Sequence, residues 1–518
     1  MIRDLMQGAP APNDVADVCI VGAGAAGIVL AVELAGRGKT VVVLEGGGTR
    51  LEEEAQDSYR SELAGLPHRG IHTGRFRAVG GTTLKWGGQI LELDERDFEA
   101  RPAVPGSGWP IPKSALTPHY ERALKLEGLA RVTRQDDAVW TQIGAAPCTF
   151  ESLEPYFSRW CPQPNFALLH RALLETSPAL TVWQHANAVE LLFGCDGDTD
   201  AATGVRARTL TGIEHIFRAR QIVFCMGAIE SSRFFLQPYG WDVPWQRNGL
   251  LGKHFQDHID ANAATVLPHD PARFHRCFDN VFSKGFKYHP KLRLSTPMQQ
   301  RLGTLNVAAT MTFQSDAEEV LGQLKGTAKK LLRGQLGDVT ASDAVAVVRH
   351  LPLLVRQTWR YGVQNRAYNP PGSKIMLRVH CEQQPDSTSS ITLTDARDAL
   401  GMQRTRLDWR ISQRELDTIR QYVLVAKDAL AGLARIVPDE QLMQRDPAFL
   451  ARCDDSNHHM GGMRMSLSAD TGLVDPDLRL HGTRNVFLCS CAVFPTSGYS
   501  NPTHTLLALA VRLGQHLG

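Results

Sequence analysis

The chain has 518 residues, of which 43% are hydrophobic and 21% charged, and its net charge is +2. This is ordinary for a globular protein of two or three domains, and the balanced charge gives no sign of nucleic-acid binding. The ten cysteines are scattered without a C-x-x-C pair, so we expect no disulfide framework and a reducing, cytoplasmic compartment.

The first 16 residues are predicted to be a disordered lead-in. They lack the apolar core of a secretion signal. Elsewhere, no uncharged run reaches the roughly 18 residues that a membrane-spanning helix needs.

Residues 17–48 carry a βαβ pattern. A buried strand (17–21) is followed by a G-x-G-x-x-G turn, an apolar helix (28–34), a second buried strand (40–44) and Glu45. In a dinucleotide-binding unit the glycines permit the turn and close approach of the pyrophosphate, while the acid binds the ribose. An ordinary βαβ unit is the alternative. The residues assigned to the dinucleotide are Gly22, Gly24, Ala25, Ala26, Gly27 and Glu45.

Residues 51–66 are predicted to be an acidic helix, and residues 75–88 a glycine-rich segment. The second contains two Gly-Gly pairs around small hydroxyl residues and one Trp, which allows close approach of a flat ligand. A surface loop is the alternative. Ser114 is predicted to cap a helix that runs to Leu126.

The middle of the chain alternates strand and helix signals. Strands are predicted at 180–193, 204–211 and 214–225, and Gly227 opens a helix to Leu236, again a layout that suits a phosphate. Further strands are expected at 374–384, 389–394 and 404–411, before a helix from Ser412 to Leu433. The basic helical region 317–361 is either a solvated insertion or a face that touches a membrane or a protein.

Two stretches near the C-terminus concentrate reactive groups. In the first, His458 and His459 precede Gly-Gly, and histidine is the usual general base near neutral pH. Structural or surface histidines are the alternative. We expect no metal site, because adjacent residues point apart and no third ligand is suitably spaced.

In the second stretch, a buried strand (485–488) and small residues precede Asn501 and Pro502. These two are predicted to be the N-cap and first residue of an apolar helix. Such a helix N-terminus suits an anion, or a ring that gains negative charge on reduction. A well-capped terminal helix is the alternative.

Four patterns follow one another along the chain: the βαβ unit, Val-Gly-Gly-Thr-Thr…Trp-Gly-Gly, His-x-x-Gly-Gly-x-x-Met and Asn-Pro-x-x-Thr. Together they resemble the glucose-methanol-choline (GMC) oxidoreductase family. The resemblance implies FAD and the oxidation of an alcohol CH–OH group to a carbonyl. It implies that His458 takes the hydroxyl proton while hydride goes to flavin N5, and that Asn501 orients the substrate oxygen. His459 would point elsewhere.

The chain departs from the family pattern at several positions. Gly462 and Ser466 replace a Thr and a Gly, and Ser490 replaces an Asp at the flavin site. Lys85 stands where some members attach flavin through His, so we expect non-covalent FAD. The remaining contacts that the resemblance implies are Gly80, Gly81, Thr82, Thr83, Trp86, Gly87, Val189 (its backbone amide to the adenine), Gly227, Ser490, Cys491, Asn501, Pro502 and Thr503.

The predicted fold class is α/β with an α+β substrate part. It comprises a doubly wound FAD-binding domain of discontinuous segments (1–95, 180–259 and 453–518) and an antiparallel-sheet substrate domain. Residues 96–179 and 260–452 form most of the substrate domain and its connections.

The expected substrate is a sugar, glycoside or similar polyol, with O2 or a carrier as the electron acceptor. One alternative is the same flavin chemistry on a non-sugar alcohol, with a quinone or carrier acceptor at a membrane surface that 317–361 touches. Another is a non-catalytic flavin-binding protein.

Overall fold

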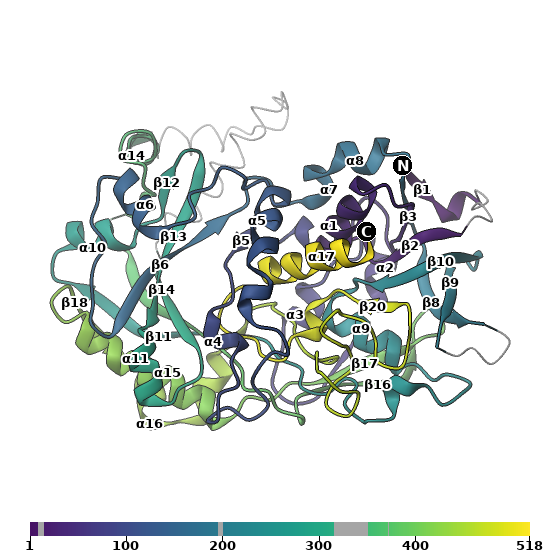
Figure 1. Ribbon diagram of the computed structural model, residues 1–518. Helices are drawn as coiled ribbons and strands as arrows, with labels where there is room; N and C mark the ends of the chain where they lie inside the picture. Colours follow the sequence, from purple (N-terminus) through teal and green to yellow (C-terminus); the bar gives the residue numbers. More distant parts are fainter. Residues whose placement is uncertain (9–14, 195–199, 315–350, 371) are drawn as a thin grey trace.

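Two large sheets of different kinds organise the computed structural model, which describes residues 1–8, 15–194, 200–314, 351–370 and 372–518 (Figure 1). One sheet is mainly parallel and the other antiparallel, which confirms the predicted fold class. Among the described residues, no helix is both long and apolar enough to cross a membrane.

The parallel sheet draws its strands from both ends and the middle of the chain. Its parallel core has the order β1-β7-β3-β2-β10-β20, formed by Ile2–Asp4, Leu180–Gln184, Val41–Leu44, Ala16–Val21, Glu214–Phe224 and Val486–Leu488. β8 (Asn187–Phe193) and β9 (Ala202–Arg208) continue it as an antiparallel ribbon beside the first half of β10. The central strands are nearly continuous runs of buried apolar residues, as expected for a parallel sheet covered on both faces.

The first and last helices of the chain lie together. α1 (Ala25–Gly36) packs beside α17 (Thr503–Leu517), and α5 (Thr117–Leu126) packs against α17 as well. In Figure 1 the yellow α17 accordingly lies next to the purple α1. The C-terminus therefore returns to the sheet that the N-terminal βαβ unit began.

The antiparallel sheet has the order β18-β11-β15-β14-β13-β6-β5, with β12 on β13 and β19 on β11. α15 (Gln413–Ala429) packs against it, and its N-cap Ser412 forms a capping box with Glu415, as the predicted helix start requires. The strands, in that order, are Ala434–Pro438, Ile259–Pro268, Lys374–Cys381, Val307–Gln314, Phe286–Leu294, Leu153–Trp160, Gln89–Ile90, Val281–Ser283 and Asp454–Asp455.

A small third sheet pairs β16 (Ser390–Arg397), β17 (Gln403–Asp408) and β4 (Glu62–Leu63). α9 (Gly227–Leu236) packs against its first two strands. The other described helices are α2 (Glu53–Asp57), α3 (Gly70–Thr73), α4 (Glu95–Phe98), α6 (Asp136–Gln142), α7 (Phe166–Leu169), α8 (Arg171–Thr176), α10 (Pro271–Phe278), α11 (Thr296–Leu302), α14 (Leu351–Gly362) and α16 (Glu440–Gln444).

Three local predictions were wrong. The N-terminal lead-in is not all disordered, because Ile2 pairs with Val182 at the sheet edge and the Met1 amino group donates to Leu180 O over 2.6 Å. The helix predicted over 51–66 is only α2, since the later residues pair with β17 instead. Ser114 lies in a 3-10 turn, and α5 begins after Leu116. In the first two cases, backbone pairing with a distant strand overrides the local composition.

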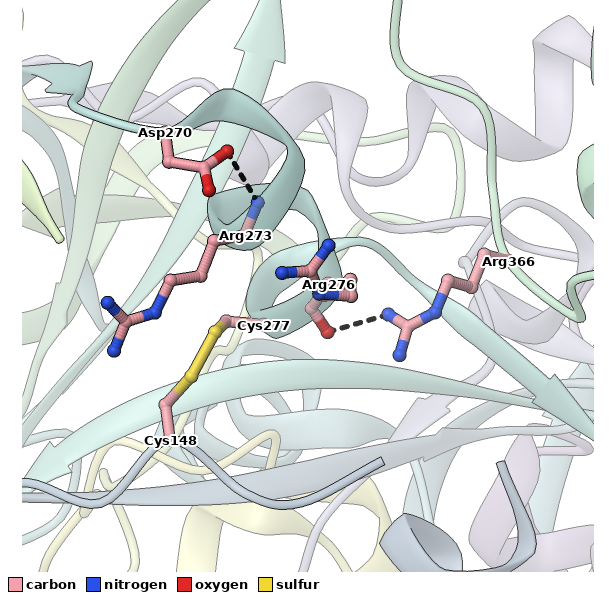
Figure 2. Close-up of a disulfide and its surroundings, with 6 residues drawn as sticks. All are labelled: Cys148, Asp270, Arg273, Arg276, Cys277 and Arg366. Carbon is pink, nitrogen blue, oxygen red and sulfur yellow. Dashed lines mark hydrogen bonds between the residues drawn. A yellow bond between two sulfur atoms is a disulfide. The ribbon is translucent and has the colours of Figure 1, made fainter. Parts of the chain in front are cut away.

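A disulfide joins Cys148, which precedes β6, to Cys277 on α10, with a Cα–Cα distance of 6.2 Å (Figure 2). The sequence predicted no disulfide framework, and this single disulfide removes the support that cysteine usage gave to a reducing compartment. The sequence pattern could not show the pairing, because the two cysteines lie 129 residues apart. On the same helix, Arg276 O accepts a hydrogen bond from Arg366 over 2.7 Å, as Figure 2 shows.

Most of the basic region 317–361 (residues 317–350) lies outside the described residues. The described part is α14, on which Val355 and Trp359 are 60% and 59% exposed. Arg360, near the end of this helix, is paired with the buried Asp279.

Candidate active site

One pocket lies at the carboxyl ends of the parallel strands. Its wall includes Gly22 after β2, Glu45 after β3, Cys225 after β10 and Cys489 after β20. Open α/β sheets bind ligands at this edge. The pocket continues from there to His458 and to the start of α17.

Glu45 closes the first end of the pocket. Its carboxylate is buried and accepts hydrogen bonds from Ala23 N (2.9 Å) and Gly47 N (3.0 Å), which hold the ends of β2 and β3 together. A carboxylate offers about four lone-pair sites. Two therefore remain for the hydroxyl groups of a ribose.

Three helices begin at the pocket wall, and none of them has a side-chain cap. α1 starts after Gly24, α9 after Met226 and α17 after Pro502. Uncapped N–H groups and the helix dipole favour an anion at each of these positions. The pyrophosphate of FAD and the ring that becomes negative on reduction both match this requirement.

Gly24 provides a test of whether the pocket fits such a group. Its φ of −79° and ψ of −167° suit any residue, and a Cβ placed on it would meet no described atom within 4 Å. Neither a positive φ nor packing against described atoms therefore requires this glycine, whereas a ligand held against the pocket wall would. Gly27 differs, because a Cβ there would lie 1.9 Å from Gly22 O, inside the turn itself.

The glycine-rich segment forms one side of the pocket, as predicted. A Cβ on Gly81 would lie 2.9 Å from Gly24 Cα, so the two backbones touch. Thr83 donates to Gly80 O over 2.5 Å, and the Trp86 indole donates to Pro164 O over 2.6 Å. The first bond lies within the segment and the second ties it to Pro164, while Gly80 N donates to Ala23 O over 2.8 Å and so holds the segment against the turn before α1.

A charged network on the pocket wall was missed from the sequence. Arg75 pairs with Glu230 over 3.0 Å, and Arg233 pairs with the same carboxylate over 3.2 Å. Burial alone would raise the pKa of Glu230, but the three arginines around it lower the pKa below its usual value. Arg77, the third, keeps a buried Nε without a partner among the described residues. Glu230 and Arg233 lie three residues apart on α9, but no spacing in the sequence links them to Arg75 and Arg77, which come from a distant segment.

The other end of the pocket is formed by the loop that carries His458. Met460 pairs with Gln256 through two backbone hydrogen bonds of 2.9 Å, and Gly461 turns at a φ of +74° against His254 O. These contacts tie the loop to the chain that leads into β11.

His458 uses both ring nitrogens. Its Nε2 lies 3.0 Å from Asn501 Nδ2, and its Nδ1 lies 2.9 Å from His258 Nδ1. Burial lowers the pKa of His458 well below the usual histidine value, and electrostatic interactions with His258, His380 and Lys291 oppose a positive charge on it further. His458 is therefore neutral at pH 7, and its Nε2 has the hydrogen-bond geometry of an acceptor.

Asn501 does not cap α17, contrary to the prediction. The N-cap is Pro502, and the Asn501 amide is directed to His458 instead. From the sequence, the Asn-Pro pattern was interpreted as a local capping signal. The pattern could not reveal His458 as the partner of Asn501, because His458 lies 43 residues earlier in the chain.

His459 points away from His458, toward His68 and Asp257. Nitrogen and oxygen atoms of His68, Asp257 and His459 that could bind a metal lie within 4.8 Å of one another. The spacing of residues in the sequence did not reveal that His68 and Asp257 lie beside His459. Asp257 already accepts hydrogen bonds from the backbone N of His258 (2.6 Å) and of His458 (3.0 Å), and His68 Nε2 lies 3.1 Å from it. Asp257 therefore acts as an anchor for the loop.

Most of the predicted cofactor residues line this pocket: Gly22, Gly24, Ala25, Ala26, Glu45, Gly81, Thr82, Thr83, Trp86, Gly227, Ser490, Cys491, Pro502 and Thr503. The ones outside its lining are Gly27, Gly80, Gly87, Val189 and Asn501. Gly27 serves the turn, and the wall near β8 is formed by residues 186–188 rather than by Val189.

Comparison with known proteins now adds to the geometry. Residues 385–510 match the family described as GMC oxidoreductase. A C-glycoside 3-oxidase from Microbacterium trichothecenolyticum is 30% identical over 149 residues, 28% of either chain, so the match spans under a third of that relative. A 2-methyl-1,2-propanediol dehydrogenase from Mycolicibacterium austroafricanum is 22% identical over 97% of this chain and 95% of its own.

Among solved structures, a pyridoxine 4-oxidase from Mesorbium loti shares the fold. It has a TM-score of 0.58 at 16% identity and covers 97% of this chain and 99% of its own. The fold therefore extends over the whole length, and the family match covers the segment with His458 and Asn501. Residues 385–510 therefore match the GMC oxidoreductase family, and the pocket fits FAD, the cofactor of that family.

Proposed function

We propose that this protein oxidises the CH–OH group of a sugar, glycoside or related polyol to a carbonyl, with FAD as its cofactor. The observation that carries the proposal is the neutral His458 at the end of the dinucleotide pocket, with its Nε2 3.0 Å from the Asn501 amide. The substrate class rests on the partial similarity to a C-glycoside 3-oxidase.

The residues that would hold FAD follow from the pocket. Glu45 would bind the ribose, the start of α1 the pyrophosphate, and the start of α17 the flavin ring. The FAD-binding domain would comprise 1–95, 180–259 and 453–518, which supply the parallel strands. Binding would be non-covalent, since Lys85 stands at the attachment position.

The chain's own residues would handle the proton. A substrate hydroxyl would replace the contact between His458 and Asn501, donating its proton to His458 Nε2 while its oxygen accepts from Asn501 Nδ2. FAD, when bound, supplies the hydride acceptor at flavin N5 for the C–H hydrogen. The substrate thus loses one proton and one hydride and becomes a carbonyl compound.

A carrier or quinone acceptor at a membrane surface is a second candidate, favoured by one observation. Val355 and Trp359, one turn apart on α14, are exposed, and the exposed Arg356 is adjacent to Val355, a combination suited to a membrane or protein contact. Co-sedimentation with anionic vesicles, together with oxygen consumption during turnover, separates this candidate from an O2-dependent oxidase.

Anaerobic incubation of the flavin-loaded protein with a panel of sugars, glycosides, polyols and simple alcohols tests the proposal. Loss of the visible flavin absorbance with a sugar or polyol is expected. If the flavin stays oxidised with every compound, the non-catalytic flavin-binding alternative replaces the proposal. If only simple alcohols reduce it, the substrate class is wrong.

A further inference from the structure

His258 contacts His458 on the side opposite to Asn501. It lies directly before β11, it is 1% exposed, and its Nδ1 is 2.9 Å from His458 Nδ1. Its other ring nitrogen, Nε2, lies 3.2 Å from the backbone carbonyl oxygen of the buried Ser497. Ser497 O, His258, His458 and Asn501 thus form one chain of contacts.

The chemistry of the two ends decides where the protons lie. A carbonyl oxygen can only accept, so His258 Nε2 carries a hydrogen and donates it to Ser497 O. Burial lowers the pKa of His258, so the ring is neutral and its Nδ1 is an acceptor. His458 Nδ1 must then be the donor, which leaves His458 Nε2 without a hydrogen and facing the Asn501 amide.

We propose that His258 is a positioning residue that holds His458 in the tautomer with a free Nε2. This inference rests on the proposed role of His458 as the base. In the opposite tautomer, the hydrogen on Nε2 would face the substrate hydroxyl, and no proton could be taken. The same contact accepts the Nδ1–H of His458 once Nε2 has gained the substrate proton.

The backbone holds the two rings in register. Asp257 accepts from the backbone N of His258 over 2.6 Å and from that of His458 over 3.0 Å, so one carboxylate anchors both residues. His68 Nε2 lies 3.1 Å from the other oxygen of this carboxylate, Asp257 Oδ2. The pairing of the histidines is therefore set before any substrate arrives, as a catalytic site requires.

Two substitutions of His258 separate its acceptor role from simple filling of space. His258→Asn keeps an acceptor, the side-chain oxygen, near the Nδ1 position, whereas His258→Leu fills the space without one. We expect anaerobic flavin reduction to slow by about 10²-fold in His258→Leu, within the range that general-base catalysis contributes. The rate in His258→Asn should stay within about tenfold of wild type, because the acceptor remains. His170→Leu removes another buried imidazole, whose Nε2 has no hydrogen-bond partner among the described residues, and as the control it should leave the rate unchanged.

Nitrogen-15 NMR of histidine-labelled protein provides a readout that does not depend on turnover. The ring signals of His458, identified by their loss in His458→Gln, should show a protonated Nδ1 and a bare Nε2 in wild type and His258→Asn. In His258→Leu, a hydrogen on Nε2 should appear. Wild-type tautomer and rate in His258→Leu would overturn the inference and leave the proposed function intact. If the wild-type flavin is reduced by no alcohol, the proposed function fails, and the NMR result still decides the tautomer.

Discussion

The two ends of the pocket are built by different means. At the nucleotide end, the backbone provides most of the wall: the turn at Gly22–Gly27 and the uncapped starts of α1 and α9. At the other end, the side chains of His258, His458 and Asn501 meet from three separate segments. The first end depends on exposed backbone groups beside the Glu45 carboxylate, whereas the second depends on the protonation of two imidazoles. Substitutions at the nucleotide end should therefore weaken FAD binding, whereas substitutions at the other end should slow flavin reduction.

The largest effect is expected for His458→Ala. The variant should bind FAD normally, because the nucleotide end is untouched, while the rate constant of anaerobic flavin reduction falls by about 10³-fold, within the range for loss of a general base. Stopped-flow absorbance measures the rate, and the bound flavin per protein measures the cofactor. A variant that keeps its flavin and reduces it at the wild-type rate would remove His458 from the mechanism.

Asn501→Ala should have the second largest effect, again at the side-chain end alone. The rate should fall by roughly 10- to 100-fold, because the amide would no longer orient the substrate oxygen. Stability should hardly change, since the structure places the cap of α17 at Pro502.

The matched control for this prediction is Ser412→Ala, which removes a real N-cap from α15. Urea unfolding should show a loss of about 1 kcal/mol for Ser412→Ala and little for Asn501→Ala. An equal loss in both variants would restore the capping role that the sequence suggested for Asn501.

This contrast also explains how much could be predicted from the sequence. The nucleotide end was predicted in detail because Gly22, Gly27 and Glu45 lie within one continuous βαβ unit whose local pattern determines its geometry. His458 was proposed as the base from its loop motif, and the structure places it on the pocket wall. His258 was missed, because a histidine before a buried strand has no local signal, and only the fold brings it to a residue 200 positions later. The same reason hid the Cys148–Cys277 disulfide and the role of Asp257.

A smaller effect, confined to the backbone end, is expected for Gly24→Ala. The added methyl group meets no described atom, so the unfolding temperature of the flavin-free protein should fall only by the small cost of replacing a glycine N-cap. It projects into the pocket, however, and FAD affinity should weaken by roughly tenfold, as for a contact overfilled by one methyl group. Gly36→Ala, at the other end of the same helix, is the control and should leave FAD affinity unchanged, while the unfolding temperature stays the same or rises because alanine favours a helix more than glycine does. Unchanged FAD affinity in Gly24→Ala would mean that the cofactor does not pass this glycine.

The smallest effect is that of pH on the wild-type rate, which tests the protonation state of the imidazole at the catalytic end of the pocket. A general base must be unprotonated, and a histidine with an ordinary pKa near 6.5 would lose activity about tenfold per pH unit on the acid side of that value. Burial and neighbouring charge lower the pKa of His458 well below this value, so the neutral form persists as the pH falls. The rate constant of flavin reduction should therefore change less than about twofold between pH 9 and 6 and decline only at more acidic pH. Stopped-flow measurements with saturating substrate across this range test the prediction. A midpoint near 6.5 would show that the ring is more exposed to water than its position between His258 and Asn501 implies.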